Sequence, residues 1–163
     1  VFGLMGGHDP GPPPAPSNFP RRLRVRPDSD TPEVQTVLND GNFELPCVSA
    51  TERGLPYTHA YMIRAIPGEL FARTLCELDG KTLTARHYEF GPKEFCSEPV
   101  ICDELDGQQG RYLLTQIYNG ADKRSYYAVM DRQNFMDGPV ARIQLRHHVP
   151  VSFHGYWSAA ELD

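Results

Sequence analysis

The chain has 163 residues, of which 40% are hydrophobic, and it carries a formal net charge of −5. This length corresponds to about one domain. The negative charge argues against an electrostatic footprint for nucleic acid, so no nucleic-acid partner is expected. No apolar run approaches the ~18 residues of a membrane-spanning helix, and none is predicted within this sequence.

Residues 1–20 form a Pro/Gly-rich stretch that is predicted to be a linker or loop. Five prolines lie between Pro10 and Pro16, accompanied by Gly6, Gly7 and Gly11. Such a composition cannot bury a core. We therefore assign the folded part to residues 21–163.

From about Arg21 onward, short apolar runs alternate with turn signals, which indicates an all-β sandwich, barrel or propeller. The runs predict strands at Arg22–Arg26, Glu33–Leu38, Thr58–Arg64, Leu70–Cys76, Thr82–Tyr88, Pro99–Cys102, Arg111–Tyr118, Arg124–Met130 and Val140–Leu145. Turn signals lie at Asp40-Gly41, Asp79-Gly80, Asp106-Gly107, Asn119-Gly120 and Asp137-Gly138. Asp-Gly and Asn-Gly pairs supply the positive φ that tight hairpins need. Hairpins are predicted at Asp79-Gly80 and Asn119-Gly120.

The cysteines are too widely spaced for a C-x-x-C motif, and the chain is not a small Cys-dense scaffold. Free and mostly buried thiols, as in a reducing cytosol, are expected for all four. They are Cys47, Cys76, Cys96 and Cys102.

One histidine near the C-terminus, His154, follows the last predicted strand and precedes Gly155. A neutral imidazole is the commonest protein ligand for a borderline metal, and glycine beside it allows close approach of the backbone. Taken alone, a single His is more often structural than a ligand. The aromatic residues around it, Phe153, Tyr156 and Trp157, are equally consistent with lining a site and with packing.

Three segments change this interpretation. They read GNFELPCVSATERGLPYTHAYMI, CSEPVICDELDGQQGRYLLTQIYN and GPVARIQLRHHVPVSFHGYW. In order and approximate spacing they resemble segments of the carotenoid cleavage oxygenases, the family that includes the retinal pigment epithelium isomerase and bacterial stilbene-cleaving dioxygenases. The resemblance extends from about Pro20 to Glu161.

The resemblance implies a seven-bladed β-propeller with a non-haem Fe(II) on its axis, held by four His and three Glu that orient the ligands. His154 matches the last of the four metal ligands. Glu44 and Glu98 match the second and third Glu. The other ligands belong to segments that precede this sequence, so we interpret the chain as the C-terminal blades of a larger, all-β enzyme.

The implied reaction is cleavage of a carbon–carbon double bond in a carotenoid or apocarotenoid by O₂. Cleavage of a stilbene is an alternative, so the expected substrate is an apolar polyene or stilbene. The sequence is also compatible with a non-catalytic β-rich scaffold and, more remotely, with a lectin-like module. The expected location is the cytoplasm, with membrane association or a plastid as alternatives, and peripheral membrane contact would involve segments absent from this sequence.

The same resemblance leads to a geometric expectation. Glu98 should lie near the ring nitrogen of His154 that does not face the metal, and Glu44 should orient a ligand from elsewhere. His147 and His148 are expected at surface or outer positions, because adjacent residues of an extended segment point to opposite faces. His59 is expected to pack in its strand.

Overall fold

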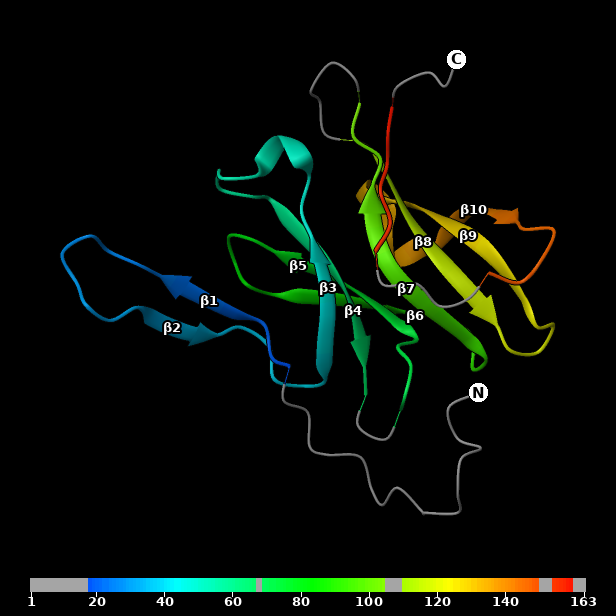
Figure 1. Ribbon diagram of the computed structural model, residues 1–163, viewed down its shortest axis with the longest axis horizontal. Helices are drawn as coiled ribbons and strands as arrows, with labels where there is room; N and C mark the ends of the chain where they lie inside the picture. The colour runs from blue at the N-terminus through cyan, green and yellow to red at the C-terminus, as the bar shows by residue number, and fades with distance from the viewer. Residues whose placement is uncertain (1–17, 67–68, 105–109, 150–153, 160–163) are drawn as a thin grey trace.

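A computed structural model describes residues 18–66, 69–104, 110–149 and 154–159 (Figure 1). These ranges hold two short 3₁₀ helices, η1 (Ala50–Glu52) and η2 (Arg132–Asp137). They also hold strands β1 (Arg21–Arg24), β2 (Glu33–Thr36), β3 (Asn42–Cys47), β4 (His59–Ala65), β5 (Thr74–Asp79), β6 (Ala85–Glu89), β7 (Glu94–Ile101), β8 (Tyr112–Asn119), β9 (Arg124–Asp131) and β10 (Pro139–Gln144). In these ranges no helix has the length and apolar character needed to cross a bilayer.

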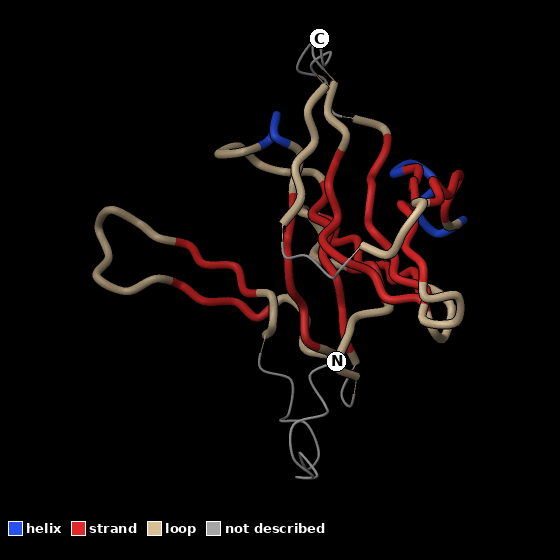
Figure 2. Tube along the Cα trace, turned by 45° about the vertical axis from the view of Figure 1, so that its right-hand side comes forward, coloured by secondary structure: helices blue, strands red, loops and turns tan. Residues whose placement is uncertain are grey.

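Within each sheet, strands that are consecutive in the chain pair with each other, and every strand pair is antiparallel. The result is two four-stranded meanders, in the orders β3-β4-β5-β6 and β7-β8-β9-β10. A separate hairpin, β1-β2, projects away from both sheets (Figure 2). The prediction of an antiparallel all-β protein is thus confirmed.

The main core lies between the two sheets. Side chains of successive strand residues point to opposite faces, so Tyr61 and Leu75 of the first sheet meet Leu113, Ile117 and other residues of the second. The side chains at the intervening positions of the first sheet pack in a second apolar cluster on its other face. That cluster contains Phe43, Ala60, Met62, Cys76 and Leu78. Strand β5 is buried along most of its length because it contributes to both clusters.

Both predicted hairpins are present, but their glycines do not provide the positive φ. In these two loops positive φ falls instead on Leu83 (60°) and Lys123 (54°), whereas the predicted turn Asp137-Gly138 does have positive φ at its glycine (84°). The loops are held by their first residues: Asp79 Oδ1 accepts from the N–H groups two and three residues further on (2.8 and 2.7 Å), and Asn119 Oδ1 does the same (2.8 and 3.3 Å). Gly80 is needed for close approach, since an added Cβ would lie 2.3 Å from a backbone oxygen of a neighbouring loop.

Some predicted strand positions were wrong. Strand β3 was not predicted, and the run Leu70–Cys76 is a strand only from Thr74 onward. The predicted Pro99–Cys102 is the end of a longer strand, β7. Residues 1–17 of the predicted linker and the predicted turn Asp106-Gly107 lie outside the described residues.

Candidate metal centre

The two candidate carboxylates lie on the first strands of the two sheets, and both strands carry a one-residue bulge there. In β3 the register shifts between Glu44 and Cys47. In β7 it shifts between Cys96 and Pro99, so Glu98 lies within the bulge. Such bulges re-aim side chains and are frequent beside active sites. β3 and β7 are also edge strands, so their outer flanks carry no further strand of their own sheets.

Glu98 holds the residue pair His154-Gly155 with both of its oxygens. Oε1 lies 3.2 Å from His154 Nδ1, and Oε2 accepts a hydrogen bond from the Gly155 N–H (2.6 Å). The imidazole is well exposed, at 77%, whereas the Glu98 side chain is 18% exposed. A neutral imidazole that donates from Nδ1 carries its lone pair on Nε2, which is the tautomer a metal ligand needs. The contact expected between Glu98 and His154 is therefore present.

Glu44 belongs to a separate set of contacts. Its Oε1 accepts a hydrogen bond from Asn18 Nδ2 (2.9 Å), and its side chain is exposed. The carboxylate that meets His154 is thus Glu98. The expectation that Glu44 orients a ligand from elsewhere stays a prediction.

The other histidines of the described ranges lie in packing or surface environments. His147 and His148 are exposed, and the His148 ring meets Tyr118 edge to face at 5.1 Å between centroids. His59 is half-buried, with its ring 6.5 Å from that of Tyr61. Burial lowers the pKa of His87, which lies 3.8 Å from Asp40. Among the described residues, no group of three or more His, Cys, Asp or Glu could hold a metal ion.

The cysteines are free, as predicted, and Cys76 and Cys96 are buried. Burial, together with a smaller effect of the nearby Glu98 charge, raises the pKa of Cys47 to about 12. The Cys47 thiol is therefore protonated at neutral pH.

Two residues near the Glu98–His154 pair, Asp103 and Trp157, make hydrogen bonds that the sequence did not predict. Asp103, two residues beyond β7, accepts hydrogen bonds on its carboxylate from Ser49 Oγ (2.8 Å), Ala50 N–H (2.7 Å) and Gly110 N–H (3.0 Å). Its carbonyl oxygen accepts from Trp157 Nε1 (3.1 Å). The sequence marked Trp157 only as an aromatic residue near the site, and Phe153 lies outside the described residues.

Comparison with known proteins places this geometry in a family. Residues 7–159 match the family described as retinal pigment epithelial membrane protein. The chain is 28% identical over 141 residues to the apocarotenoid-15,15'-oxygenase of Synechocystis sp., covering 84% of this chain and 29% of that protein. It is 28% identical over 140 residues to the chloroplastic 9-cis-epoxycarotenoid dioxygenase NCED1 of Oryza sativa subsp. japonica, covering 80% of this chain and 22% of that protein.

Solved structures of other proteins share this fold. Cobalt-substituted Synechocystis apocarotenoid oxygenase has a TM-score of 0.76 at 27% identity, covering 85% of this chain and 29% of that chain. The lignostilbene dioxygenase of Pseudomonas brassicacearum has a TM-score of 0.74 at 23% identity, covering 85% and 32%, which indicates a shared fold. The chain spans less than a third of the length of the curated relatives it matches. It belongs to the carotenoid cleavage oxygenase family, which includes the retinal pigment epithelial membrane protein.

Proposed function

We propose that this chain is part of a non-haem Fe(II) dioxygenase that cleaves a carbon–carbon double bond of a carotenoid or apocarotenoid with O₂. The observation that carries the proposal is the contact of Glu98 with His154 and Gly155, in a chain that belongs to the carotenoid cleavage oxygenases. The apocarotenoid and epoxycarotenoid substrates in the names of two relatives favour a polyene substrate.

We propose further that the two meanders are consecutive, C-terminal blades of a seven-bladed propeller. Four-stranded antiparallel sheets that follow each other in the chain and pack face against face have the arrangement of neighbouring blades. β3 and β7, the first strand of each sheet, would then face the axis. That position would direct Glu44 and the Glu98–His154 pair toward one central site.

In this proposal His154 supplies one imidazole nitrogen to the metal, and Glu98 accepts the proton of the other. The donor chemistry fits iron, because imidazole suits first-row metals and a metal-bound His usually donates its second N–H to a carboxylate. Bound iron would supply the chemistry with O₂. The chain's own residues hold and orient one ligand, and Glu44 would orient another from outside this sequence.

A stilbene substrate is the second candidate, because the similarity to a lignostilbene dioxygenase extends over 85% of this chain. The protein is proposed to act in the cytoplasm or, as in the chloroplastic rice relative, in a plastid. Peripheral membrane contact would belong to segments outside this sequence.

The test uses the complete protein that contains this chain. Iron is measured by elemental analysis, and products are measured from one carotenoid panel and one stilbene panel. His154→Ala should abolish both iron loading and turnover, whereas His147→Ala, a change at an exposed histidine, should have much less effect. Full iron occupancy and normal turnover in His154→Ala would overturn the proposal. A wild-type protein without metal would favour a non-catalytic scaffold.

A further inference from the structure

The segment that carries His154 is attached to β7 by side chains rather than by strand pairing. Residues 154–159 form no strand, yet they run alongside β7 (Figure 1). Gly155 lies beside this strand, since an added Cβ would be in ordinary van der Waals contact with Val100 Cγ2, at 3.5 Å. Hydrogen bonds anchor the segment at two points: the Glu98 carboxylate at its start, and the Asp103 carbonyl at Trp157.

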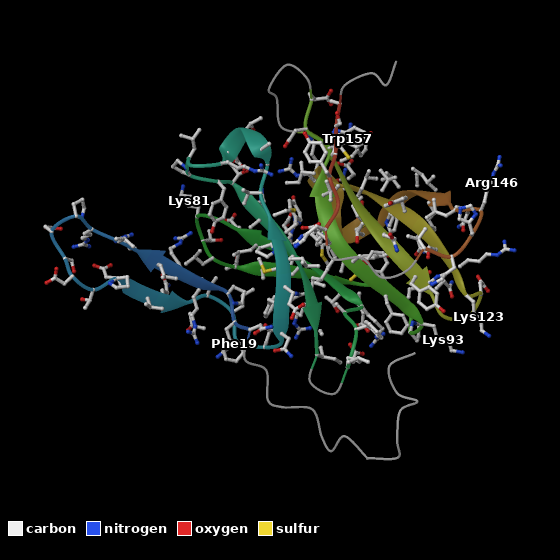
Figure 3. All side chains as sticks on the ribbon, in the orientation of Figure 1. Phe19, Lys81, Lys93, Lys123, Arg146 and Trp157 are labelled. Carbon is white, nitrogen blue, oxygen red and sulfur yellow. The ribbon has the colours of Figure 1, made fainter. Side chains whose placement is uncertain are left out.

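These two hydrogen-bonded points determine the position of the segment along β7. Glu98 meets His154 and Gly155, and Asp103 meets Trp157, so the segment runs in the same direction as β7. Figure 3 shows Trp157 beside the end of this strand. The Glu98 contacts hold only the first two residues of the segment, and the imidazole itself is 77% exposed. The Glu98 contact alone would therefore let the segment shift, whereas a second anchor close by opposes such a shift.

The acceptor of the Trp157 hydrogen bond, Asp103, is itself held by hydrogen bonds to its carboxylate. Its carboxylate joins the start of η1, at Ser49 and Ala50, to Gly110. Burial alone would raise the pKa of this carboxyl, but the hydrogen bonds from Gly110, Ser49 and Ala50 outweigh burial and hold it below its usual value. The carboxylate therefore stays ionised at neutral pH. The Asp103 carbonyl, to which Trp157 donates, is held relative to both sheets.

We propose that Trp157 is a positioning residue for the His154 imidazole. Its indole N–H, bonded to the Asp103 carbonyl, sets the place from which His154 is presented to a metal. The inference rests on the proposed function, because it assumes that His154 is a ligand. Groups that orient a metal ligand typically change metal affinity by about 10–100-fold, so loss of this hydrogen bond should affect metal binding more than stability.

The test compares Trp157→Phe with Tyr156→Phe in the complete protein. The first change removes the N–H and keeps an aromatic ring, and the second alters a neighbouring tyrosine that is 90% exposed. Metal affinity is measured with Fe(II), and ligand geometry is measured from the visible spectrum of Co(II)-loaded protein. Trp157→Phe should weaken metal binding by about 10–100-fold and alter the Co(II) spectrum. Its melting temperature should fall by no more than a few degrees, and Tyr156→Phe should match wild type.

A third variant, Trp157→Gln, separates positioning from packing. Its amide can still donate to the Asp103 carbonyl, so it should bind metal better than Trp157→Phe although it packs less well. Weaker binding in Trp157→Gln than in Trp157→Phe would overturn the inference, and so would equal losses in Trp157→Phe and Tyr156→Phe. If wild type binds metal and Trp157→Phe is identical to it, this inference fails alone. If wild type binds no metal, the proposed function fails with it.

Discussion

At the scale of single residues, Glu98 is the side chain on which the candidate centre depends. One oxygen meets the His154 ring and the other accepts the Gly155 N–H. Glu98→Gln replaces one acceptor oxygen with a donor, so one of these two contacts is lost while His154 keeps its donor atom. We expect iron affinity and turnover of the complete protein to fall by roughly 10–100-fold, measured by metal titration and product formation.

A matched control for this change is Glu33→Gln, on the projecting hairpin, where the carboxylate pairs with Arg24 and Arg26. Exposed ion pairs contribute little to protein stability, so the Glu33→Gln variant should load iron like wild type. Wild-type iron affinity in Glu98→Gln would contradict the assigned role of Glu98.

The sequence was sufficient to predict the pair that meets, Glu98 and His154, because both belong to short segments with a family resemblance. It was not sufficient for Asp103 and Trp157. Asp103 acts on Trp157 through its main-chain carbonyl, which every residue type has. Its carboxylate joins loops that are far apart in the chain. Neither use leaves a pattern of residue types or spacing.

At the scale of elements, a polar network centred on the buried Tyr61 and Glu77 connects β4, β5, β6 and η2. Tyr61 is fully buried, and its hydroxyl donates to Glu77 Oε1 (3.0 Å). Arg86 pairs with the other oxygen of Glu77. Arg132 Nε donates to the Tyr61 hydroxyl (3.3 Å), with its guanidinium 5.4 Å from the ring centroid. Burial raises the pKa of Tyr61, and the Glu77 charge adds to the effect, so the hydroxyl stays protonated.

Tyr61→Phe should therefore destabilise the complete protein by about 1–3 kcal/mol, because a buried carboxylate loses a donor and Arg132 loses an acceptor. Urea unfolding measures the change. Tyr112→Phe is the control, since Tyr112 is 41% exposed and removal of its hydroxyl should cost within ~0.5 kcal/mol. Equal stabilities of Tyr61→Phe and wild type would show that the network does not contribute to stability.

The errors in strand prediction have local physical causes. β3 and β7 each contain a bulge and a proline, which interrupt the alternation on which the prediction relied. The hairpins at Asp79 and Asn119 were found because Asx-Gly pairs mark turns. The reason was wrong, however, because the Asx side chains hold the loops and positive φ falls on Leu83 and Lys123.

At the scale of the whole molecule, the described part leaves large apolar surfaces uncovered. The projecting hairpin exposes Leu23, Val25 and Val34. Between the hairpin and the first sheet lies an open groove whose lining includes Phe43 and Met62. Patches of this kind mark contact surfaces, and in the proposed propeller further blades would cover them. The antiparallel fold class could be predicted from strand spacing, whereas the propeller came only from the family resemblance and stays a proposal.

The last prediction concerns the isolated 163-residue chain, which should neither bind Fe(II) tightly nor cleave carotenoids. One exposed imidazole cannot replace a full ligand set, and the described residues contain no group of three or more candidate ligands. A site that cannot exclude water also loses the electrostatic advantage of an enclosed one.

Anaerobic Fe(II) dialysis followed by elemental analysis should give far less than one iron per chain, with no aldehyde or ketone product. His154→Ala in the isolated chain should change neither result, and the complete protein treated in parallel should retain iron. One tightly held iron per isolated chain, lost in His154→Ala, would mean that this chain alone builds a metal site and that the four-histidine assignment is wrong.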